Sequence, residues 1–432
     1  MSPTIQKEFA TEIVRQLRAA GHTALWAGGC VRDLLMGIEP LDYDVATSAT
    51  PDQVRELFGY RRTLPVGVAF GVVIVLGKPS RQSLQVEVAT FRTDAAYSDG
   101  RHPDAVVFST PQEDAQRRDF TINGMFYDPL AESVIDYVGG QADLQRGCLR
   151  AIGRADDRIG EDKLRMLRAV RFAARFGFDI ERATRQAIAR HAAEVNCVSG
   201  ERIWTEISKT LQSSRPGWAV DEWYQLNLLQ HILPELNAVW PEQRVLAGQL
   251  LEAQRQSADW LDRLCGLLWI ATEQASELDT EQSKTGLSGL LESLKGRLKV
   301  SNQVVDVLRF VIPAQRGLVD AQARAWSQVQ PLLVSTYADR AVGLFEARGS
   351  LVNAASQAAA WRETVAWLHH KLSLPRAQLD PPPLLLGHDL IALGLRPGPR
   401  FRELLCEARQ RQLDHMLLDR SAALQWLRAQ AD

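Results

Sequence analysis

The stretch LWAGGCVRDLLMGIEPLDYDVAT, residues 25–47, decides the fold of the first part of the chain. Gly28 and Gly29 separate an apolar run from a segment with helical spacing, and this order predicts a turn between a strand and a helix. The backbone amides at such a turn and the dipole of the following helix suit a phosphate group, to which Arg32 adds a cation. A glycine pair alone is a weak signal, because most such pairs form plain turns.

Two acidic residues follow in LDYDVAT, where Asp42 and Asp44 flank Tyr43. In a strand, residues i and i+2 point to the same face, so the two carboxylates would converge. Such convergence is costly unless a divalent cation neutralises it, and beside a phosphate-binding turn it favours Mg²⁺. Glu87 in LQVEVATF offers a third carboxylate on a neighbouring strand. The alternative is a solvated acidic pair on an edge strand, with Glu87 also facing solvent.

Outward from this stretch, the spacing of apolar and β-forming residues divides the chain into an α/β part and a helical part. Runs rich in β-forming residues, GVAFGVVIVLG, LQVEVATF and ESVIDYV, continue up to about residue 150. From Arg158 onward the apolar spacing is helical, with short breaks at 214–217 and 381–383. The sequence predicts an α+β protein with a head over 1–150, followed by a helical neck over 151–215, a body over 216–310 and a tail over 311–432.

Composition narrows the class of protein. The 432 residues carry 50 basic and 52 acidic side chains, so contact with nucleic acid has to rely on local basic patches. The five cysteines contain no CxxC pair, which favours reduced thiols in the cytoplasm over a disulfide framework or a zinc site. No apolar run reaches the roughly 18 residues of a membrane span, so we expect neither export nor membrane insertion.

Three further motifs complete the pattern: RRDFTINGM (117–125), EDKLRMLRAVRF (161–172) and ERIWTEISKTL (201–211). With GGCVRDLLMG and DYD, they resemble in order and spacing the class II tRNA nucleotidyltransferase and bacterial poly(A) polymerase family. The likeness covers most of the first 240 residues and returns at 384–399. It implies a polymerase-β-like nucleotidyltransferase head before the helical neck, body and tail. The implied activity is addition of nucleotides to an RNA 3′ end without a template.

The resemblance also implies roles for the residues of the first stretch. Asp42 and Asp44 match the family's metal carboxylates in a two-metal mechanism with Mg²⁺, and Glu87 is the third candidate catalytic carboxylate. Gly28, Gly29 and Arg32 match the family's phosphate-binding turn. We expect Asp33 to orient Arg32 rather than to touch substrate. The implied substrates are CTP, ATP and the 3′ end of tRNA, with no DNA and no membrane as partner.

In RRDFTINGM, Asp119 and Asn123 stand four residues apart on a predicted helix and therefore share a face. An acceptor and an amide in this arrangement could clasp a ribose and select NTP over dNTP. Arg118 matches a family position that contacts nucleotide phosphate. The alternative is a helix N-terminus at which Asp119 merely offsets the dipole.

The segment from 161 to 176 carries a stripe of arginines on one predicted helix face: Arg165, Arg168, Arg171 and Arg175. Such stripes are usually solvated surfaces. The resemblance implies instead that Asp162 and Arg165 read the Watson–Crick edge of the incoming base, and Arg168 is assigned to the same nucleotide site. A carboxylate accepts from the exocyclic amine of cytosine or adenine, and a guanidinium donates to a ring acceptor.

Four further features of the sequence bear on function. The segment 94–108 resembles the family's flexible loop, which tells against an enzyme that adds only CC. The dipeptide His388-Asp389 is interpreted as a coincidence, and no phosphohydrolase activity is predicted, because 261–274 contains no histidine. Five arginines between Arg396 and Arg411 could contact RNA or form a solvated face. The tryptophans after residue 239 are expected in the core rather than as stacking platforms for bases.

Three functions remain open from the sequence. The first is addition or repair of the CCA end of tRNA. The second is a poly(A) polymerase of the same family, or a partial enzyme that adds only CC or only A. The third, from another class, is a non-catalytic RNA-binding protein on the same scaffold. That last interpretation needs lost carboxylates or a broken phosphate turn, and both are intact.

Overall fold

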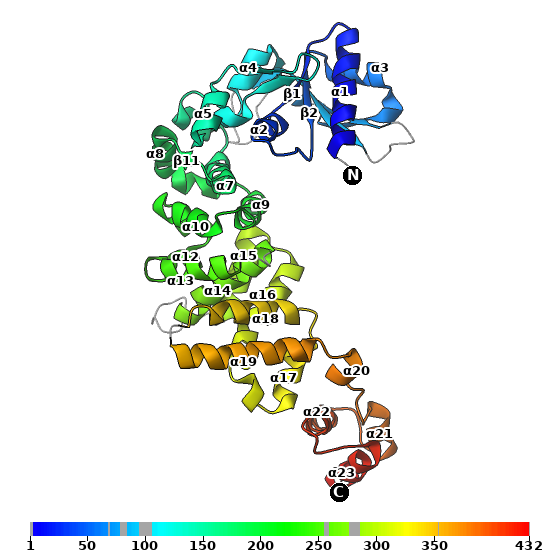
Figure 1. The fold of residues 1–432 in the computed structure, drawn as a ribbon. Coiled ribbons are helices and arrows are strands. Elements are labelled where there is room, and N and C mark those ends of the chain that lie inside the picture. Colours follow the sequence, from blue (N-terminus) through cyan, green and yellow to red (C-terminus); the bar gives the residue numbers. More distant parts are fainter. Residues whose placement is uncertain are drawn as a thin grey trace. The chain divides into compact units, whose positions relative to one another are not determined.

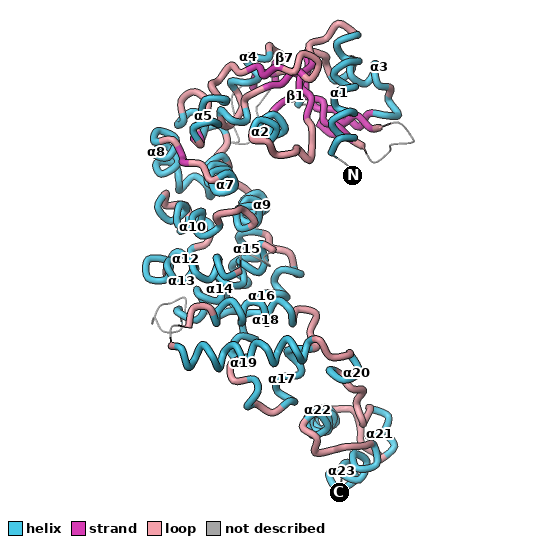
Figure 2. The backbone as a smooth tube through the Cα atoms, in the orientation of Figure 1, coloured by secondary structure: helices cyan, strands magenta, loops and turns pink. Residues whose placement is uncertain are grey.

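The structure, a computed structural model, describes residues 3–67, 70–77, 84–94, 106–254, 259–275, 286–352 and 354–431. The chain divides into two compact units, Met1–Pro234 and Glu235–Asp432, which are described separately (Figure 1). The expected fold class is confirmed: strands occur only in the first unit of the described chain, and helices make up nearly all the rest (Figure 2).

The first unit is built on a mixed sheet whose described strands follow the order β3-β4-β5-β2-β1-β8-β9. Neighbouring strands are antiparallel except β2 and β5, which run parallel. Valine-rich runs form β4 and β5, because β-branched side chains pack well on a pleated surface. The bounds are β1 Ala24–Ala27, β2 Asp44–Thr47, β3 Thr63–Gly67, β4 Val72–Leu76, β5 Gln85–Thr90, β8 Phe126–Asp128 and β9 Ser133–Ile135.

Helix α1 (Pro3–Ala19) covers the sheet with an apolar face that includes Ile13 and Leu17, both almost fully buried against Trp26 of β1. The strand register then sets the position of the acidic residues. Ala27 at the end of β1 pairs with Asp44 at the start of β2, so the turn after β1 lies beside the acidic pair. Val45 of β2 pairs with Val88 of β5, which brings Glu87 next to Asp44.

Small strands and helices complete the first unit. Two further pairs of strands are β6 Arg92–Asp94 with β7 Val106–Phe108, and β10 Cys148–Leu149 with β11 Asp179–Ile180. The remaining helices are α2 Gly29–Leu35, α3 Pro51–Phe58, α4 Pro111–Gln116, α5 Gly140–Arg146, α6 Ala155–Glu161, α7 Arg165–Phe176, α8 Arg182–His191, α9 Gly200–Leu211, α10 Pro216–Gln225 and α11 Leu229–Ile232.

Helix α7 carries the predicted arginine stripe, and its opposite face is buried through Leu167 and Val170. The stripe is not a solvated surface throughout. Arg171 is buried and donates to Glu206 of α9, with Nε and Oε2 separated by 2.5 Å. A buried charge is retained in a fold when it is paired in this way.

The second unit consists of helices in the part of the chain that the structure describes. Their bounds are α12 Pro234–Asn237, which begins at the unit boundary, α13 Trp240–Ala253, α14 Trp260–Ala275, α15 Gly286–Leu298, α16 Asn302–Leu318, α17 Trp326–Leu333, α18 Ala338–Gly349, α19 Ala355–Leu372, α20 Arg376–Leu379, α21 Gly387–Ala392, α22 Pro399–Leu413 and α23 Arg420–Ala431. No helix among the described residues combines the length and apolar character needed to cross a membrane.

The structure of this unit bears on two expectations from the sequence, the boundary between body and tail and the position of the tryptophans. Helix α16 runs through residue 310, so a boundary between body and tail at that position would cut a helix, and the division into four regions stays a prediction. Of the seven tryptophans after residue 239, Trp240 is buried as expected, whereas the other six are half-buried. Trp361, for example, stacks on Phe345 with ring centroids 4.2 Å apart.

Candidate active site

A cavity of about 510 Å³ in the first unit collects most of the predicted site residues. Asp42 and Glu87 are the two predicted residues that do not line it, whereas Arg117 and Phe172 line it without having been assigned a role from the sequence. The lining residues come from the turn after β1, the start of β2, the segment after α4, and α6–α7: Gly28, Gly29, Arg32, Asp44, Arg117, Arg118, Asp119, Asn123, Asp162, Arg165, Arg168 and Phe172.

The predicted turn between strand and helix is present, with β1 ending at Ala27 and α2 beginning at Gly29. Gly28 has φ 75° and ψ −126°, a backbone conformation that residues other than glycine rarely adopt. A Cβ atom at this position would also lie 2.9 Å from Nη1 of Arg118. Glycine is therefore required at this position both for the turn and for the close approach of the arginine.

Arg32 lies beneath this turn and is only 4% exposed. Its guanidinium donates to Oδ1 of Asp33, with Nη2 at 2.6 Å, and Nη1 donates to Oδ1 of Asn123 at 2.6 Å. The guanidinium also stacks over Phe176, 4.5 Å from the ring centroid. The expected contact between Asp33 and Arg32 is present, and it orients the cation because Nε and Nη2 both donate to Oδ1 of Asp33.

The acidic pair keeps the alternation expected of a strand, although β2 begins only at Asp44 and Asp42 precedes it. Both aspartates are exposed while Tyr43 between them is buried. Although Asp44 is open to solvent at the cavity, the protein packed around its carboxyl removes part of its water. This loss of water, together with the charges of Glu87 and Asp42, raises the pKa of Asp44 to about 6, against a lowering effect of Arg118. Like charges gathered in this way are an arrangement that a bound cation would relieve.

These carboxylates fit a divalent cation only as part of a larger ligand set. Within the described residues, no group of three histidine, cysteine or acidic side chains stands close enough to hold a metal ion by itself. Mg²⁺ commonly binds through one or two carboxylates and completes its shell with water and substrate phosphates. Asp42 and Asp44 suit that mode of binding, and their roles as metal ligands remain predictions.

The segment RRDFTINGM does not form the predicted α-helix. Helix α4 ends at Gln116, Phe120 is extended and bridges to Ala151, and only Thr121–Asn123 form a single 3₁₀ turn. The prediction was wrong because this bridge to a distant segment overrides the local helical pattern. The tight turn nevertheless brings the two predicted residues together, as Nδ2 of Asn123 donates to Oδ1 of Asp119 at 3.0 Å.

Asp119 is an acid of the cavity whose negative charge is stabilised by Arg168 and by several hydrogen bonds. Its Oδ2 accepts from Nε and Nη2 of Arg168 at 3.0 and 2.6 Å, and its Oδ1 also accepts from the backbone N–H of Phe120 at 2.8 Å. Burial acts to raise its pKa, but Arg168 and the hydrogen bonds from Asn123 and Phe120 outweigh it and lower the pKa to about 2. Arg168 thus contacts Asp119 in this structure.

Asp162 and Arg165 both line the cavity, and each has protein partners. Oδ2 of Asp162 accepts from Nη2 of Arg202 at 2.8 Å, which ties the end of α6 to α9. Nη1 of Arg165 donates to Oε2 of Glu161 at 2.5 Å, and its Nη2 donates to the carbonyl of Arg117 at 3.3 Å. These contacts hold the predicted base-reading pair at the junction of α6 and α7.

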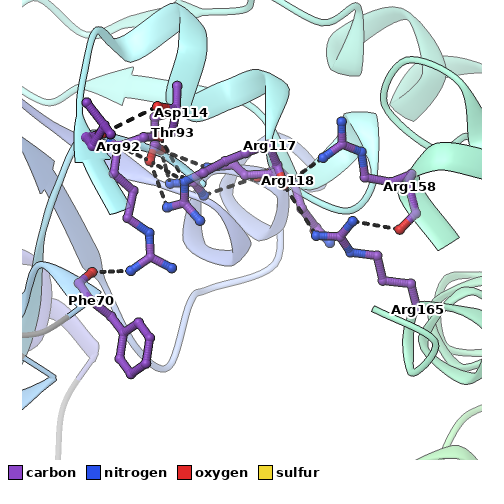
Figure 3. A network of polar contacts seen from close by, with 10 residues as sticks. Phe70, Arg92, Thr93, Asp114, Arg117, Arg118, Arg158 and Arg165 are labelled. Carbon is purple, nitrogen blue, oxygen red and sulfur yellow. Dashed lines mark hydrogen bonds and ion pairs between the residues drawn. The ribbon is translucent and has the colours of Figure 1, made fainter. Parts of the chain in front are cut away.

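Sequence reasoning missed Asp114, a buried residue of α4 that binds both Arg117 and Arg118. Figure 3 draws this network, which continues through the carbonyl of Arg117 to Arg158 and Arg165. The signal was available, because Asp114 stands three and four residues before the two arginines, the spacing at which helical neighbours meet.

Two other expectations concern segments outside the cavity. The predicted flexible loop lies largely outside the described residues, which include its flanking pair β6 and β7. Asp389 of the His-Asp dipeptide is buried, accepts from the backbone N–H of Leu386 at 2.8 Å and pairs with Nη2 of Arg420 at 2.5 Å. The first contact caps the N-terminus of α21, and the second is an ion pair with α23.

Comparison with known proteins identifies the family. The family model for the poly(A) polymerase head domain matches residues 24–150. A second family model, described as the probable RNA and SrmB-binding site of polymerase A, matches residues 177–239. A CCA-adding enzyme of Enterococcus faecalis is 31% identical over 98% of this chain and 96% of its own. Poly(A) polymerase I of Salmonella typhi is 38% identical over 57% of this chain and 54% of its own.

With some curated relatives the match is partial, and the chain then spans about half of the relative's length. Among solved structures, the CCA-adding enzyme of Bacillus stearothermophilus in complex with CTP is similar with a TM-score of 0.72 and 26% identity, covering 100% of this chain and 98% of that one. Because relatives above 30% identity match over nearly the full length of both chains, the protein belongs to the family of nucleotidyltransferases that contains the CCA-adding enzymes and the bacterial poly(A) polymerases.

Proposed function

We propose that this protein builds or repairs the 3′-terminal CCA of tRNA from CTP and ATP without a nucleic-acid template. The observation that carries the proposal is the cavity itself. One space holds a glycine turn for phosphate, an acid suited to a metal, a pair for a ribose and a pair for a base edge. The names of relatives that match over nearly the full length of this chain favour CCA addition.

Asp42 and Asp44, with Glu87 nearby, would hold Mg²⁺ in this proposal. When bound, Mg²⁺ lowers the pKa of the primer 3′-hydroxyl and neutralises the triphosphate, so that an in-line displacement releases pyrophosphate. The contribution of the described part of the chain is to bring these carboxylates close together without a basic partner. No ion pair to any of the three is present within the described residues.

The triphosphate would lie at the turn after β1, where backbone amides and Arg118 can donate to its oxygens. Asp119 and Asn123 would then meet the ribose, because both line the same cavity as Gly28. Oδ1 of Asn123 is held by Arg32, and Oδ2 of Asp119 by Arg168. Side chains fixed by such contacts lose little entropy when the ribose binds.

The base edge would be read by Asp162 and Arg165. A carboxylate can accept several hydrogen bonds, so Asp162 retains capacity for the exocyclic amine of cytosine or adenine while it binds Arg202. Arg165 donates to a ring nitrogen or carbonyl. Uracil and guanine present the opposite donor and acceptor pattern at these positions, so the pair would disfavour UTP and GTP.

A poly(A) polymerase, or a partial enzyme that adds only CC or only A, would use the same cavity, and relatives of the first kind occur among the matches. A non-catalytic RNA-binding protein would not need Asp42 and Asp44 unpaired. The cysteines are all free, in keeping with the reducing cytoplasm, where we expect the protein to act.

The test offers purified protein and Mg²⁺ three tRNA transcripts, ending before CCA, after C and after CC, together with an unstructured RNA. Each is incubated with labelled CTP or ATP, and extension is read on a sequencing gel. The proposal predicts that the first transcript gains CCA and that addition then stops. Long A tracts on the unstructured RNA would indicate a poly(A) polymerase, addition to a single transcript a partial enzyme, and no addition a non-catalytic protein.

A further inference from the structure

Asp114 lies behind the cavity wall and does not line it. It is 1% exposed and lies in α4, and each oxygen of its carboxylate accepts two hydrogen bonds from one arginine. Oδ1 accepts from Nε and Nη2 of Arg117 at 2.9 and 2.7 Å, and Oδ2 accepts from Nε and Nη2 of Arg118 at 3.1 and 2.9 Å (Figure 3). Oδ1 also accepts from the backbone N–H of Arg92 at 3.3 Å. Among these partners Arg117 and Arg118 line the cavity, so Asp114 can influence a substrate there through these two arginines.

Arg118 is the partner that faces the phosphate turn. Its Nε–Nη2 edge is turned to Asp114, while Nη1 donates to the carbonyl of Asn123 at 3.3 Å and lies close enough to Gly28 to exclude a side chain there. The guanidinium also stacks over Phe126, 5.1 Å from the ring centroid. Asp114 therefore fixes one edge of the guanidinium and leaves the other directed at the turn.

Arg117 is the second partner and leads in another direction. Its Nε also donates to the backbone carbonyl of Arg92 in β6 at 3.1 Å. Its own carbonyl accepts from Nη1 of Arg158 at 3.2 Å and from Nη2 of Arg165 at 3.3 Å. This branch leads toward the base side of the cavity, so the two branches predict different effects on nucleotide use.

The geometry points to Asp114 as a positioning residue for the triphosphate, which holds Arg118 against the glycine turn and so sets the strength with which the cavity binds phosphate. This inference rests on the proposed nucleotidyl transfer. A long arginine side chain without this anchor would have to be ordered by the substrate, at a cost in binding. The expected effect is the same for CTP and ATP, because both carry the same triphosphate.

The experiment compares wild-type protein with Asp114→Asn, which keeps the volume of the side chain and removes its charge. We expect KM for CTP and for ATP to rise together by about tenfold or more, since a misplaced binding group can cost up to about 100-fold. The inhibition constant of inorganic pyrophosphate should rise by a similar factor. We expect kcat to change by less than about threefold, and tRNA binding, measured by gel shift, to be retained.

A matched control is Asp128→Asn. Asp128 is also buried in the first unit and accepts from Arg18 at 2.7 Å and from the backbone N–H groups of Leu130 and Ala131, away from the cavity. This variant should lose thermal stability without any rise in KM. If Asp114→Asn behaves in the same way, the role of Asp114 is structural and the inference is wrong.

A double-mutant cycle with Arg118→Gln separates the two branches. If Asp114 acts through Arg118, Asp114→Asn adds no further rise in KM in the Arg118→Gln background. Additive rises would overturn the inference, as would a change limited to the preference for CTP or ATP over UTP, which would assign the effect to Arg165.

The same experiments separate a failure of the proposed function from a failure of the inference about Asp114. Wild-type protein that adds no nucleotide would contradict the proposed function, whereas active wild-type protein with an unchanged Asp114→Asn variant would contradict only this inference. If Asp114→Asn fails to fold, Asp114→Glu keeps the charge, displaces it by one methylene and carries the same prediction for KM and pyrophosphate.

Discussion

Two regions in and beside the cavity treat their carboxylates in opposite ways. At the start of the central strand β2, Asp42, Asp44 and Glu87 of β5 stand near one another, and within the described chain no arginine or lysine forms an ion pair with them. On the helical side, Asp119 and Asp162 are each held by an arginine. In the first region, a bound cation can neutralise the negative charge of the carboxylates. In the second region, arginines already neutralise the carboxylates and hold them in fixed positions.

The pKa values express this difference. Asp44 is shifted upward to about 6 and Asp119 downward to about 2, from a common ordinary value of 3.8. An acidic side chain therefore does not identify a metal ligand by itself. Among the described residues, the absence of an arginine partner separates the two groups of acids, and this feature cannot be seen in the sequence motifs.

The largest effect is expected from removing the unpaired acids. Asp42→Asn or Asp44→Asn should lower the rate of nucleotide addition by roughly 10³-fold or more, because metal-assisted activation of the nucleophile and stabilisation of the triphosphate are lost together. Binding of tRNA should stay within about twofold of wild type. Single-turnover extension with a gel-shift assay checks both. Addition that persists in either variant would show that the metal assignment is wrong.

The paired and unpaired acids should respond to pH with opposite signs. The pKa of Asp119 in the fold is below 3.8, so its contribution to stability is present above that value and is lost as the pH falls toward 2. Asp119→Asn should therefore lower the free energy of unfolding by roughly 2 kcal/mol at pH 7, with a smaller difference at pH 3. Urea unfolding followed by circular dichroism at both values measures this change.

Asp44 provides the opposite case in the same experiment. Its pKa in the fold lies above 3.8, so ionisation destabilises the fold as the pH rises from about 4 to 6. Without added metal, Asp44→Asn should be at least as stable as wild type at pH 7. Equal losses of stability at pH 7 in Asp44→Asn and Asp119→Asn would remove the distinction between the two regions.

A smaller effect is expected at the ribose pair. Asn123→Ala removes a donor to Asp119 and an acceptor for Arg32. We expect a rise of about tenfold in KM for CTP and ATP, the scale of a lost hydrogen bond, and weaker preference for NTP over dNTP. Steady-state kinetics with CTP and dCTP measure both quantities. An unchanged preference would remove the ribose role from Asn123.

The smallest effect is expected in the second unit, outside the comparison of the two regions. His388 is exposed at the surface, although it precedes the buried Asp389. His388→Ala should leave activity unchanged and alter the free energy of unfolding by no more than about 0.5 kcal/mol. A loss of nucleotide addition in this variant would revive a catalytic role for the dipeptide.

Local features of the site could be predicted from the sequence, and features that depend on distant contacts could not. The turn at Gly28 and the alternation around Tyr43 follow from residues that are neighbours in the chain. The helix expected over 117–125 fails because Phe120 pairs with Ala151, thirty-one positions away. The partner of Asp162 is Arg202 on another helix, and nothing in the spacing of either motif predicts that contact.

The most direct test of the distinction between the two regions is the binding of Mn²⁺, a paramagnetic substitute for Mg²⁺. Free Mn²⁺ is counted by electron paramagnetic resonance in the presence of CTP, for wild type, Asp44→Asn and Asp119→Asn. We predict that Asp44→Asn loses Mn²⁺ bound by the protein, that Asp119→Asn retains it, and that added Mg²⁺ displaces it. Retention in Asp44→Asn, or loss in Asp119→Asn alone, would contradict the claim that the unpaired acids hold the metal.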